Sequence, residues 1–182
     1  MRLISGKYKG RIVEGFNIIG TRPTMDRIKE SFIAMIQNKI KNSVCLDLFA
    51  GSGSVGLELL SNGANTCYFV DSNIKAIDIL KNNIDKLKIE ETFYLIKGDY
   101  LKALNDFKTK QLKFDIIFLD PPYDLNLIKP SLNLIKKHDL LSKDGIIVCE
   151  YINEDIEVLD YEIVKQKKYG DKLVRILKYK AS

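Results

Sequence analysis

The tetrapeptide Asp120-Pro121-Pro122-Tyr123 places a carboxylate and an aromatic ring on either side of two prolines. Proline donates no backbone hydrogen bond and disfavours a helical conformation in the residue before it, so the segment predicts a rigid turn after a strand. In such a turn the Asp120 carboxylate and the Pro121 carbonyl can accept the two protons of a planar amine, and Tyr123 can stack on the attached ring. The alternatives are a purely structural turn or a proline-rich motif for a partner. We predict that Asp120, Pro121, Pro122 and Tyr123 form the catalytic site.

A glycine-rich loop, "DLFAGSGSVG" at residues 47–56, follows an earlier apolar run. It contains a formal G-x-G-x-x-G at Gly51, Gly53 and Gly56, the pattern of a dinucleotide site, but glycine-rich turns occur wherever a backbone approaches a ligand closely. Asp47 precedes Gly51 by four residues, so its carboxylate can hold the turn or bind a ligand ammonium. We expect the amides of Gly51 and Gly53 to border a ligand, and Gly56 to serve helix packing.

Two more carboxylates occupy equivalent places later in the chain. Asp71 ends a predicted strand fifteen residues after Gly56, where a carboxylate can accept hydrogen bonds from both ribose hydroxyls. Asp99 follows the next predicted strand and can accept a hydrogen bond from an adenine amino group. Each of these two also precedes a predicted helix, so helix capping is the alternative. Because open α/β sheets bind ligands at the carboxyl ends of their strands, Asp47, Asp71 and Asp99 together favour an adenosine-containing cofactor.

These residues need a scaffold that brings the ends of successive strands together, and the chain predicts one. From Val44 onward, short apolar runs alternate with amphipathic stretches of helical spacing. Runs such as "FDIIFLD" are apolar on both faces, which is typical of central parallel strands covered by helices. The predicted strands are 44–48, 67–71, 93–96, 115–120 and 146–151, and the predicted helices are 54–61, 73–87, 99–107 and 125–137.

After Tyr151 the pattern changes to two alternating runs joined by a turn at Gly170-Asp171, which predicts a β-hairpin. The fold class is therefore α/β, a Rossmann-like and mostly parallel sheet with one antiparallel strand from this hairpin. An NAD-binding fold would instead continue with β-α-β units. The chain also lacks an obvious histidine or lysine to handle a hydride, so an NAD oxidoreductase is disfavoured.

Residues 1–43 differ from the rest of the chain. The stretch "MRLISGKYKGRIVEG" predicts a β-hairpin that turns near residues 5–10, followed by a loop and a helix from about Thr24, with that threonine as its cap. We predict two units, a basic hairpin and helix at 1–43 appended to a main domain at 44–182.

Basic charge is concentrated at the two ends of the chain. Residues 1–43 carry nine Lys/Arg against three Asp/Glu, residues 44–160 carry thirteen against nineteen, and residues 161–182 carry seven against two. Basic segments gain affinity for polyanions by displacing the counterions condensed on phosphates. The distribution predicts a polyanionic partner, with a solvated lysine-rich surface as the alternative.

Bulk features narrow the class of protein further. No apolar run is long enough to span a membrane, and the start of the chain turns polar too early for a signal peptide, so we expect a cytoplasmic protein without a membrane partner. Cys45, Cys67 and Cys149 are widely spaced within apolar runs, which favours buried thiols over a disulfide framework or a metal site. His138 is the single histidine and follows a predicted helix, so an ordinary helix-end role is expected rather than nucleophilic catalysis.

The motifs together resemble a known class of enzyme. The loop "DLFAGSGSVG", the "VD" that ends at Asp71, the "GD" that ends at Asp99 and the final "DPPY" are similar to the motifs of class I S-adenosylmethionine-dependent methyltransferases that act on amino groups of nucleobases. "DPPY" alone leaves adenine N6, cytosine N4 and guanine N2 open. "RLISGKYKGR" and "TRPTMDRIKESF" narrow the resemblance to the RsmD family, which methylates the N2 amine of a guanine in bacterial 16S ribosomal RNA. It covers nearly the whole chain.

The resemblance implies a seven-stranded class I methyltransferase fold and a role for each motif. Asp120–Tyr123 would hold the target amine for direct methyl transfer from S-adenosylmethionine. The basic hairpin would lie on RNA, and Arg22 would contact either RNA or the cofactor. The cofactor-binding residues would be Asp47, Phe49, Gly51, Gly53, Asp71, Ser72, Asp99 and Tyr100, and the RNA-binding residues would be Arg2, Lys7, Lys9, Arg11 and Arg22.

The sequence departs from the family pattern at two places. Asn62 stands where family members often carry arginine, which would remove one phosphate contact, and Asp71 stands where glutamate is common, which shortens the reach of the ribose acceptor. The expected partner is 16S ribosomal RNA within small-subunit particles, and we expect a monomer that uses no metal.

Two other functions stay open. A DNA or RNA adenine-N6 methyltransferase shares the chemistry, but such DNA enzymes usually carry a separate target-recognition region, and no insertion here is large enough to be one. A non-catalytic RNA-binding module would explain the basic ends but not "DPPY" beside a complete cofactor loop.

Overall fold

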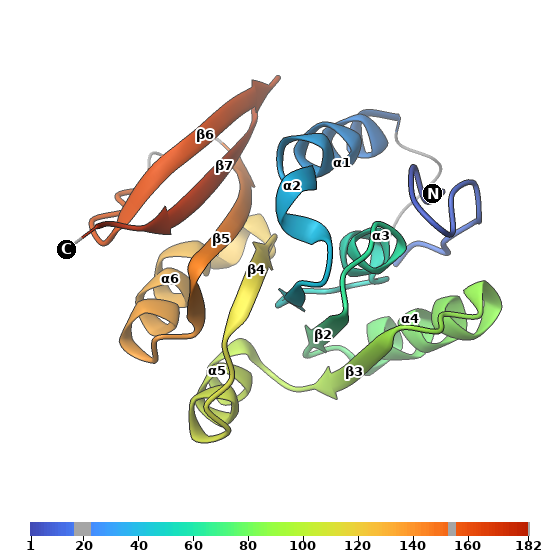
Figure 1. Cartoon of the computed structure of the whole chain (residues 1–182), viewed down its shortest axis with the longest axis horizontal. Coiled ribbons are helices and arrows are strands. Elements are labelled where there is room, and N and C mark those ends of the chain that lie inside the picture. The colour runs from blue at the N-terminus through green and yellow to red at the C-terminus, as the bar shows by residue number, and fades with distance from the viewer. Residues whose placement is uncertain (17–22, 153–155, 182) are drawn as a thin grey trace.

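The computed structural model describes residues 1–16, 23–152 and 156–181, and its strands form a single seven-stranded sheet (Figure 1). The strand order is β3-β2-β1-β4-β5-β7-β6. Strand β7 runs antiparallel to β5 and β6, and the other pairings are parallel. This confirms the predicted fold class. The strands are β1 (Val44–Asp47), β2 (Thr66–Asp71), β3 (Thr92–Lys97), β4 (Phe114–Leu119), β5 (Leu141–Ile152), β6 (Tyr161–Tyr169) and β7 (Lys172–Tyr179).

Helices connect the parallel strands. The helix predicted at 54–61 has the same bounds in the structure, and most other predicted ends differ by one or two residues. The helix predicted at 125–137 begins later, at Ile128, because Asn126 has a left-handed backbone conformation (φ 51°) that separates it from a short 3₁₀ helix. The helices are α1 (Pro23–Met35), α2 (Gln37–Ile40), α3 (Ser54–Ser61), α4 (Ile74–Leu87), α5 (Tyr100–Thr109), the 3₁₀ helix η1 (Tyr123–Leu125) and α6 (Ile128–Lys137).

Each face of the sheet has its own apolar core, because alternate residues of a strand point to opposite faces. On one face Cys67 and Phe69 of β2 belong to a cluster with residues of α1, α3 and α4. On the other face Val70 belongs to a second cluster, with residues of α5 and α6. Figure 1 shows these two groups of helices on opposite sides of the twisted sheet. The layers leave the carboxyl ends of the parallel strands to be covered by loops.

The N-terminal segment folds back on itself as the predicted hairpin does, but its antiparallel pairing is short. Arg2 and Ile12 form one isolated antiparallel bridge, and Val13 N–H donates to the Met1 carbonyl at 2.8 Å. The regular ladder does not extend further because nearby amides bond elsewhere: Ile4 N–H donates to the Glu58 carboxylate at 2.9 Å, and Lys7 N–H donates to a carbonyl at the end of α3 at 2.7 Å.

Helix α1 begins at Pro23, so Thr24 lies within its first turn and not at the position of the predicted cap. Proline suits the first helical position because its missing N–H would have no partner within the helix. Leu3, Tyr8 and Phe32 belong to the same buried cluster as the strands, so residues 1–16 and α1 pack directly on one face of the sheet. The division of the chain at residue 43 stays a prediction.

Three smaller expectations concern single residues and the membrane. Cys45, Cys67 and Cys149 are buried free thiols, as predicted, and burial raises the pKa of Cys45 to about 12. His138 ends α6 as predicted, with its Nε2 atom 2.7 Å from Asn105 Oδ1. Within the ranges that the structure describes, no helix has both the length and the apolar character needed to cross a membrane.

Candidate active site

Two cavities adjoin above the carboxyl ends of the parallel strands. The larger, of about 760 Å³, is lined by the loops that follow β1, β2, β3 and β4. The smaller, of about 250 Å³, extends toward the N-terminal segment, β5 and β7. Five residues line both cavities: Phe16, Phe49, Gly51, Asp120 and Tyr123. The larger cavity gathers the predicted site residues Phe49, Gly51, Asp71, Ser72, Asp99, Tyr100, Asp120, Pro121, Pro122 and Tyr123, and the predicted residue Asp47 lines the smaller one.

Asp71 ties the loop after β1 to the loop after β2. Its Oδ2 atom accepts the Gly51 N–H at 2.8 Å, and its Oδ1 atom accepts the Asn73 N–H at 2.9 Å. Asp71 is not the cap of α4, because Asn73 occupies that position and accepts the N–H of Lys75. Gly51 has a φ of 56°, and an added Cβ would meet no atom within 4 Å. Gly51 is therefore required by its backbone conformation, and its Cα faces open space.

Asp47 stabilises the glycine-rich turn through a buried hydrogen bond. It is 1% exposed, and its Oδ2 atom accepts the Gly56 N–H at 3.1 Å. Burial raises the pKa of the Asp47 carboxyl to about 7, an effect that the Gly56 N–H opposes and the negative charge of Asp71 reinforces. A ligand ammonium beside Asp47 would favour the ionised carboxylate. The contact with Gly56 is the turn-holding role foreseen as one of two alternatives.

The other two glycines of the loop serve its packing. Gly53 has a φ of 81°, donates its N–H to the Ala50 carbonyl at 2.8 Å, and has room for no side chain, because an added Cβ would lie 2.1 Å from Leu80 Cδ1. An added Cβ on Gly56 would lie 2.2 Å from Phe69 Cε1, which agrees with the predicted packing role. Gly51 thus borders the cavities, whereas Gly53 and Gly56 hold the loop against the helix and strand beneath it.

Asp99 both caps a helix and faces the larger cavity. It is the N-cap of α5 and accepts the Lys102 N–H at 2.8 Å through Oδ1. A carboxylate has two oxygens with about four acceptor sites, so the cap leaves capacity for a ligand. The rings of Phe49 and Tyr100, with centroids 5.9 Å apart, form an aromatic wall of the same cavity, and Ser72 lines its rim.

The Asp120 carboxyl lies at the junction of the two cavities. It is half-buried and follows the last residue of β4. Burial, and next the negative charge of Glu150, raise the pKa of Asp120 well above its ordinary value, while the positive charge of Lys172 opposes the shift. Tyr123 begins η1 and is 41% exposed, so its ring is accessible from the cavities. Hydrogen bonds donated by a ligand would stabilise the ionised form of this carboxyl.

The smaller cavity contains charged residues that the sequence analysis missed. Glu150 on β5 is 8% exposed, and its Oε1 atom lies 3.4 Å from Lys172 Nζ on β7. Lys29 on α1 also lines this cavity and is 4% exposed. One signal was present in the sequence: Glu150 directly follows the apolar run of its strand, as Asp120 follows that of β4. That signal has meaning only once β4 and β5 are known to be neighbours.

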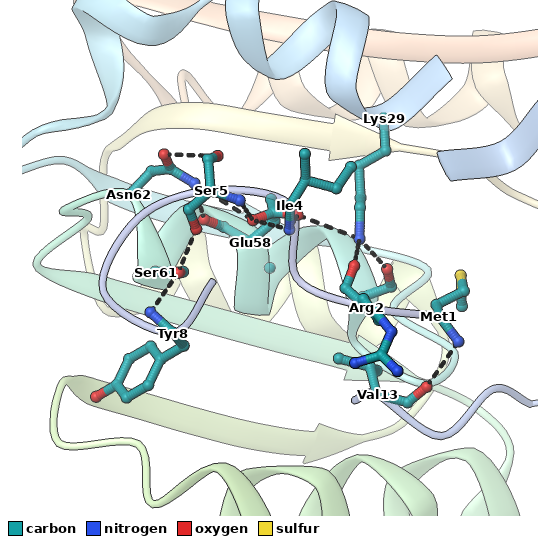
Figure 2. A network of polar contacts seen from close by, with 12 residues as sticks. Met1, Arg2, Ile4, Ser5, Tyr8, Val13, Lys29, Glu58, Ser61 and Asn62 are labelled. Carbon is teal, nitrogen blue, oxygen red and sulfur yellow. Dashed lines mark hydrogen bonds and ion pairs between the residues drawn. The ribbon is translucent and has the colours of Figure 1, made fainter. Parts of the chain in front are cut away.

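A buried ion pair attaches the N-terminal segment to α3. Figure 2 shows Lys29 reaching from α1 toward Glu58, which is fully buried on α3. Lys29 Nζ lies 3.3 Å from Glu58 Oε1 and donates to Ser54 Oγ at 2.9 Å and to the Arg2 carbonyl at 3.3 Å. Glu58 in turn accepts the Ile4 N–H. The pair therefore fixes the wall of the smaller cavity that Met1 and Lys29 contribute.

Asn62, one of the two departures from the family pattern, belongs to the same network. Its side chain donates to the Glu58 carbonyl at 2.8 Å and accepts a hydrogen bond from Ser5 Oγ at 3.0 Å (Figure 2). In this chain the residue therefore joins the end of α3 to the N-terminal loop.

The predicted RNA-binding residues of the N-terminal loop are exposed, but three of them make internal contacts. Lys7 Nζ lies 2.7 Å from Glu90 Oε2 and 3.2 Å from Glu91 Oε1. Arg11 donates to the Leu87 carbonyl at 2.6 Å, and Arg2 donates to the Gly10 carbonyl at 2.8 Å. Lys9 is exposed as well, and Arg22 lies outside the described residues. The RNA-binding role of these residues stays a prediction.

Comparisons with known proteins identify the family of this chain. The family model described as "Conserved hypothetical protein 95" matches residues 1–178. YlbH, a candidate rRNA methyltransferase of Bacillus subtilis, is 38% identical over 93% of this chain and 94% of its own length. Ribosomal RNA small subunit methyltransferase D of Haemophilus influenzae is 33% identical over 93% of this chain and 89% of its own. The solved structure of yhhF, a candidate methyltransferase of Escherichia coli, matches with a TM-score of 0.85 and 26% identity over 100% of this chain and 99% of that one. The chain therefore belongs to the family described as Conserved hypothetical protein 95, the RsmD family that its motifs indicated.

Proposed function

We propose that this chain transfers a methyl group from S-adenosylmethionine to the exocyclic N2 amine of a guanine in small-subunit (16S) ribosomal RNA. The observation that carries the proposal is the position of Asp120 and Tyr123, which line both cavities between the predicted cofactor residues and a charged recess. Relatives named as ribosomal RNA methyltransferases support methylation of ribosomal RNA. The choice of guanine N2 is the finer part of the proposal.

The larger cavity suits S-adenosylmethionine. The cofactor supplies a methyl group already activated by a sulfonium charge. Asp71 and Asp99 offer carboxylate oxygens for the ribose hydroxyls and the adenine amine, and the contacting rings of Phe49 and Tyr100 form one wall of the cavity. Gly51 leaves open the space that a side chain would fill. Asp47, which lines the adjoining smaller cavity, can pair with the ammonium group.

Residues where the two cavities meet would position the target amine. The Asp120 carboxylate and the Pro121 carbonyl would accept hydrogen bonds from its two N–H groups, and Tyr123 would stack on the base. Such orientation is the main contribution a protein can make when the electrophile is already activated. The amine loses one proton as it gains the methyl group, and Asp120 is placed to accept it. Burial and the negative charge of Glu150 raise the pKa of Asp120, and a higher pKa makes the ionised carboxylate a stronger proton acceptor.

The RNA must present its guanine outside a helix. The edge of a paired or stacked base is not free to enter a cavity in the protein, so the target would lie in a loop or be flipped out. The basic residues Arg2, Lys7, Lys9, Arg11 and Arg22 would hold the neighbouring phosphates. We further propose that a monomer acts on small-subunit particles in the cytoplasm.

The proposal is tested with labelled S-adenosylmethionine and three substrates: naked 16S ribosomal RNA, small-subunit particles and duplex DNA. After digestion to nucleosides, we expect the label in N2-methylguanosine from ribosomal RNA and none from DNA. Label in N6-methyladenosine would instead establish the adenine alternative. RNA binding without transfer to any substrate would support the binding module and contradict the proposal.

A further inference from the structure

The smaller cavity ends in two charged side chains to which the proposed reaction has so far assigned no role. The parallel pairing of β4 with β5 sets Leu119 beside Cys149, so that Asp120 and Glu150, the residues that follow them, are neighbours. Lys172, on the adjoining strand β7, has its Nζ atom 3.4 Å from Glu150 Oε1 and 5.9 Å from the centre of the Tyr123 ring. All four residues line the same cavity. Glu150 and Lys172 therefore border the place where Asp120 and Tyr123 would hold a base.

This recess holds more hydrogen-bond acceptors than donors. Asp120 and Glu150 are both acceptors when ionised, and Lys172 is the cation whose charge acts on both of them. Lys29 lines the same cavity but is paired with Glu58. Burial raises the pKa of both carboxyls, since neither is fully solvated. Charges in such a wall are costly unless they are paired. A ligand that presents two neighbouring donors and one acceptor would satisfy the recess.

The nucleobases with an exocyclic amine differ in the atom beside that amine. In guanine the N2 amine is followed by N1–H, a donor, and then by O6, an acceptor. In adenine and cytosine the atom beside the amine is a ring nitrogen that accepts. A carboxylate next to the amine-binding group therefore favours guanine and leaves adenine and cytosine with two opposed acceptors, a mismatch that binding sites penalise strongly.

We propose that Glu150 accepts the N1–H hydrogen of the target guanine and that Lys172 donates to its O6, so that this pair selects guanine among the amino-bearing bases. The inference rests on the proposed function, because it requires a base whose amine lies at Asp120. It assigns the selection to β5 and β7, outside the "DPPY" motif. The competing explanation is structural: the ion pair would only join β5 to β7, and would have no effect on the choice of base.

The test uses a base analogue that retains the target amine. After the modified guanine has been mapped, 16S ribosomal RNA is assembled with either guanine or 2,6-diaminopurine at that position, and presented free or in reconstituted small-subunit particles, whichever the unaltered chain methylates. The analogue keeps the 2-amine but has an acceptor at N1 and an amine at position 6. The unaltered chain should prefer guanine in kcat/KM by about 100-fold or more.

The Glu150→Gln variant should reduce this preference at least tenfold. Its amide can donate to the N1 acceptor of the analogue, so the rate with guanine falls while the rate with the analogue holds or rises. The Lys172→Met variant should lower the preference as well, through loss of the O6 contact. An unchanged ratio in both variants would overturn the inference, even if the rates with both bases fell by the same factor.

A matched control is the ion pair between Lys178 and Glu162, which also links two strands but is about half exposed, at 3.7 Å, and lines neither cavity. The Glu162→Gln variant should leave the preference unchanged. Thermal melting of every variant reports on folding separately. If the unaltered chain forms no N2-methylguanosine, the proposed function itself fails; if it forms that product and the ratio does not respond to Glu150 or Lys172, only the base-selecting role fails.

Discussion

The two cavities of this protein are built in different ways from one chain. Carboxylates of the larger cavity are held by backbone N–H groups, as Gly51 holds Asp71 and Lys102 holds Asp99. In the smaller cavity Asp47 is held in the same way by the Gly56 N–H, but Glu150 and Lys29 are held by other side chains, Lys172 and Glu58. Backbone donors are supplied by any sequence that keeps the loop, whereas side-chain partners must be encoded separately. We infer that the larger cavity is the general cofactor site, and that the smaller one carries what is particular to the substrate.

The largest expected effect follows from Asp120, where the cavities meet. The Asp120→Asn variant keeps the shape but weakens the acceptor for the amine protons, so turnover should fall by about 10²- to 10⁴-fold. Binding of S-adenosylhomocysteine, measured by calorimetry, should change little, because the cofactor carboxylates lie in other loops. The exposed Asp124 of the same turn provides the control, and Asp124→Asn should be nearly as active as the unaltered chain. Near-normal turnover of Asp120→Asn would remove Asp120 from the catalytic site.

The buried ion pair between Lys29 and Glu58 fixes a wall of the smaller cavity and should contribute to the stability of the fold. The Lys29→Met variant would leave Glu58 buried without its cation, so the free energy of unfolding should fall by about 3–5 kcal/mol. Urea denaturation measures the loss. The exposed pair between Lys86 and Glu14, at 3.7 Å, is the control, and Lys86→Met should cost less than about 1 kcal/mol. Equal losses in the two variants would contradict the importance of burial here.

Asp47 predicts a pH dependence of stability. Its folded-state pKa of about 7 lies above the ordinary value of 3.8, so the folded chain holds this proton more tightly than the unfolded chain. The unaltered protein should therefore lose stability as the pH rises from about 4 to about 7, by at most about 4 kcal/mol from this group. The Asp47→Asn variant keeps an acceptor for the Gly56 N–H and lacks the titration. The free energy of unfolding of this variant, relative to that of the unaltered chain, should rise across that window and then level off. A difference that does not change with pH would count against the shifted pKa.

A substitution at Asp99 can distinguish its role as a helix cap from a contact with the ligand in the larger cavity. Asparagine caps helices about as well as aspartate, so Asp99→Asn should leave the melting temperature nearly unchanged. The amide has one acceptor oxygen instead of two, and the affinity for S-adenosylhomocysteine should fall by about 1 kcal/mol, or roughly fivefold. Calorimetric titration measures this. If affinity were unchanged, Asp99 would be a helix cap alone.

The smallest expected effects concern the predicted RNA surface. Replacing Lys7, Lys9 and Arg11 together by glutamine should weaken RNA binding and reduce the dependence of log K on log salt concentration. Replacement of Lys9 alone should reduce the slope by about 1. Replacement of Lys7 should reduce it by less, because Lys7 must first break its ion pairs with Glu90 and Glu91 before it can contact RNA. Filter binding at several salt concentrations provides the slopes. Equal slopes for all variants would place the RNA surface elsewhere on the protein.

The sequence predicted the larger cavity better than the smaller one for a physical reason. Asp71 and Asp99 each sit at the end of a strand and the start of a helix, so local periodicity is enough to place them at one edge of a parallel sheet. It could not decide what each carboxylate does. The structure shows that Asp71 joins two loops and Asp99 caps α5, while both still face the cavity.

Errors in the sequence analysis occurred where distant parts of the chain compete for the same groups. The N-terminal hairpin is shorter than the sequence suggests, because the amide of Ile4 donates to Glu58 on α3 and not to a partner strand. The helix start at Ile128 was missed because the left-handed conformation of Asn126 has no strong local signal. Lys29 reads as one polar residue of an amphipathic helix, although its partner on α3 is buried with it.

By itself the sequence determined the α/β fold, the order of strands and helices, and the family, because hydrophobic periodicity and the motifs at strand ends are local properties. Only the tertiary structure decided that Asp120, Glu150 and Lys172 share a cavity, and that the N-terminal segment is fastened by a buried ion pair. Those contacts join residues that lie tens of positions apart in the chain. They depend on which strands become neighbours in the sheet, a choice that no short stretch of sequence contains.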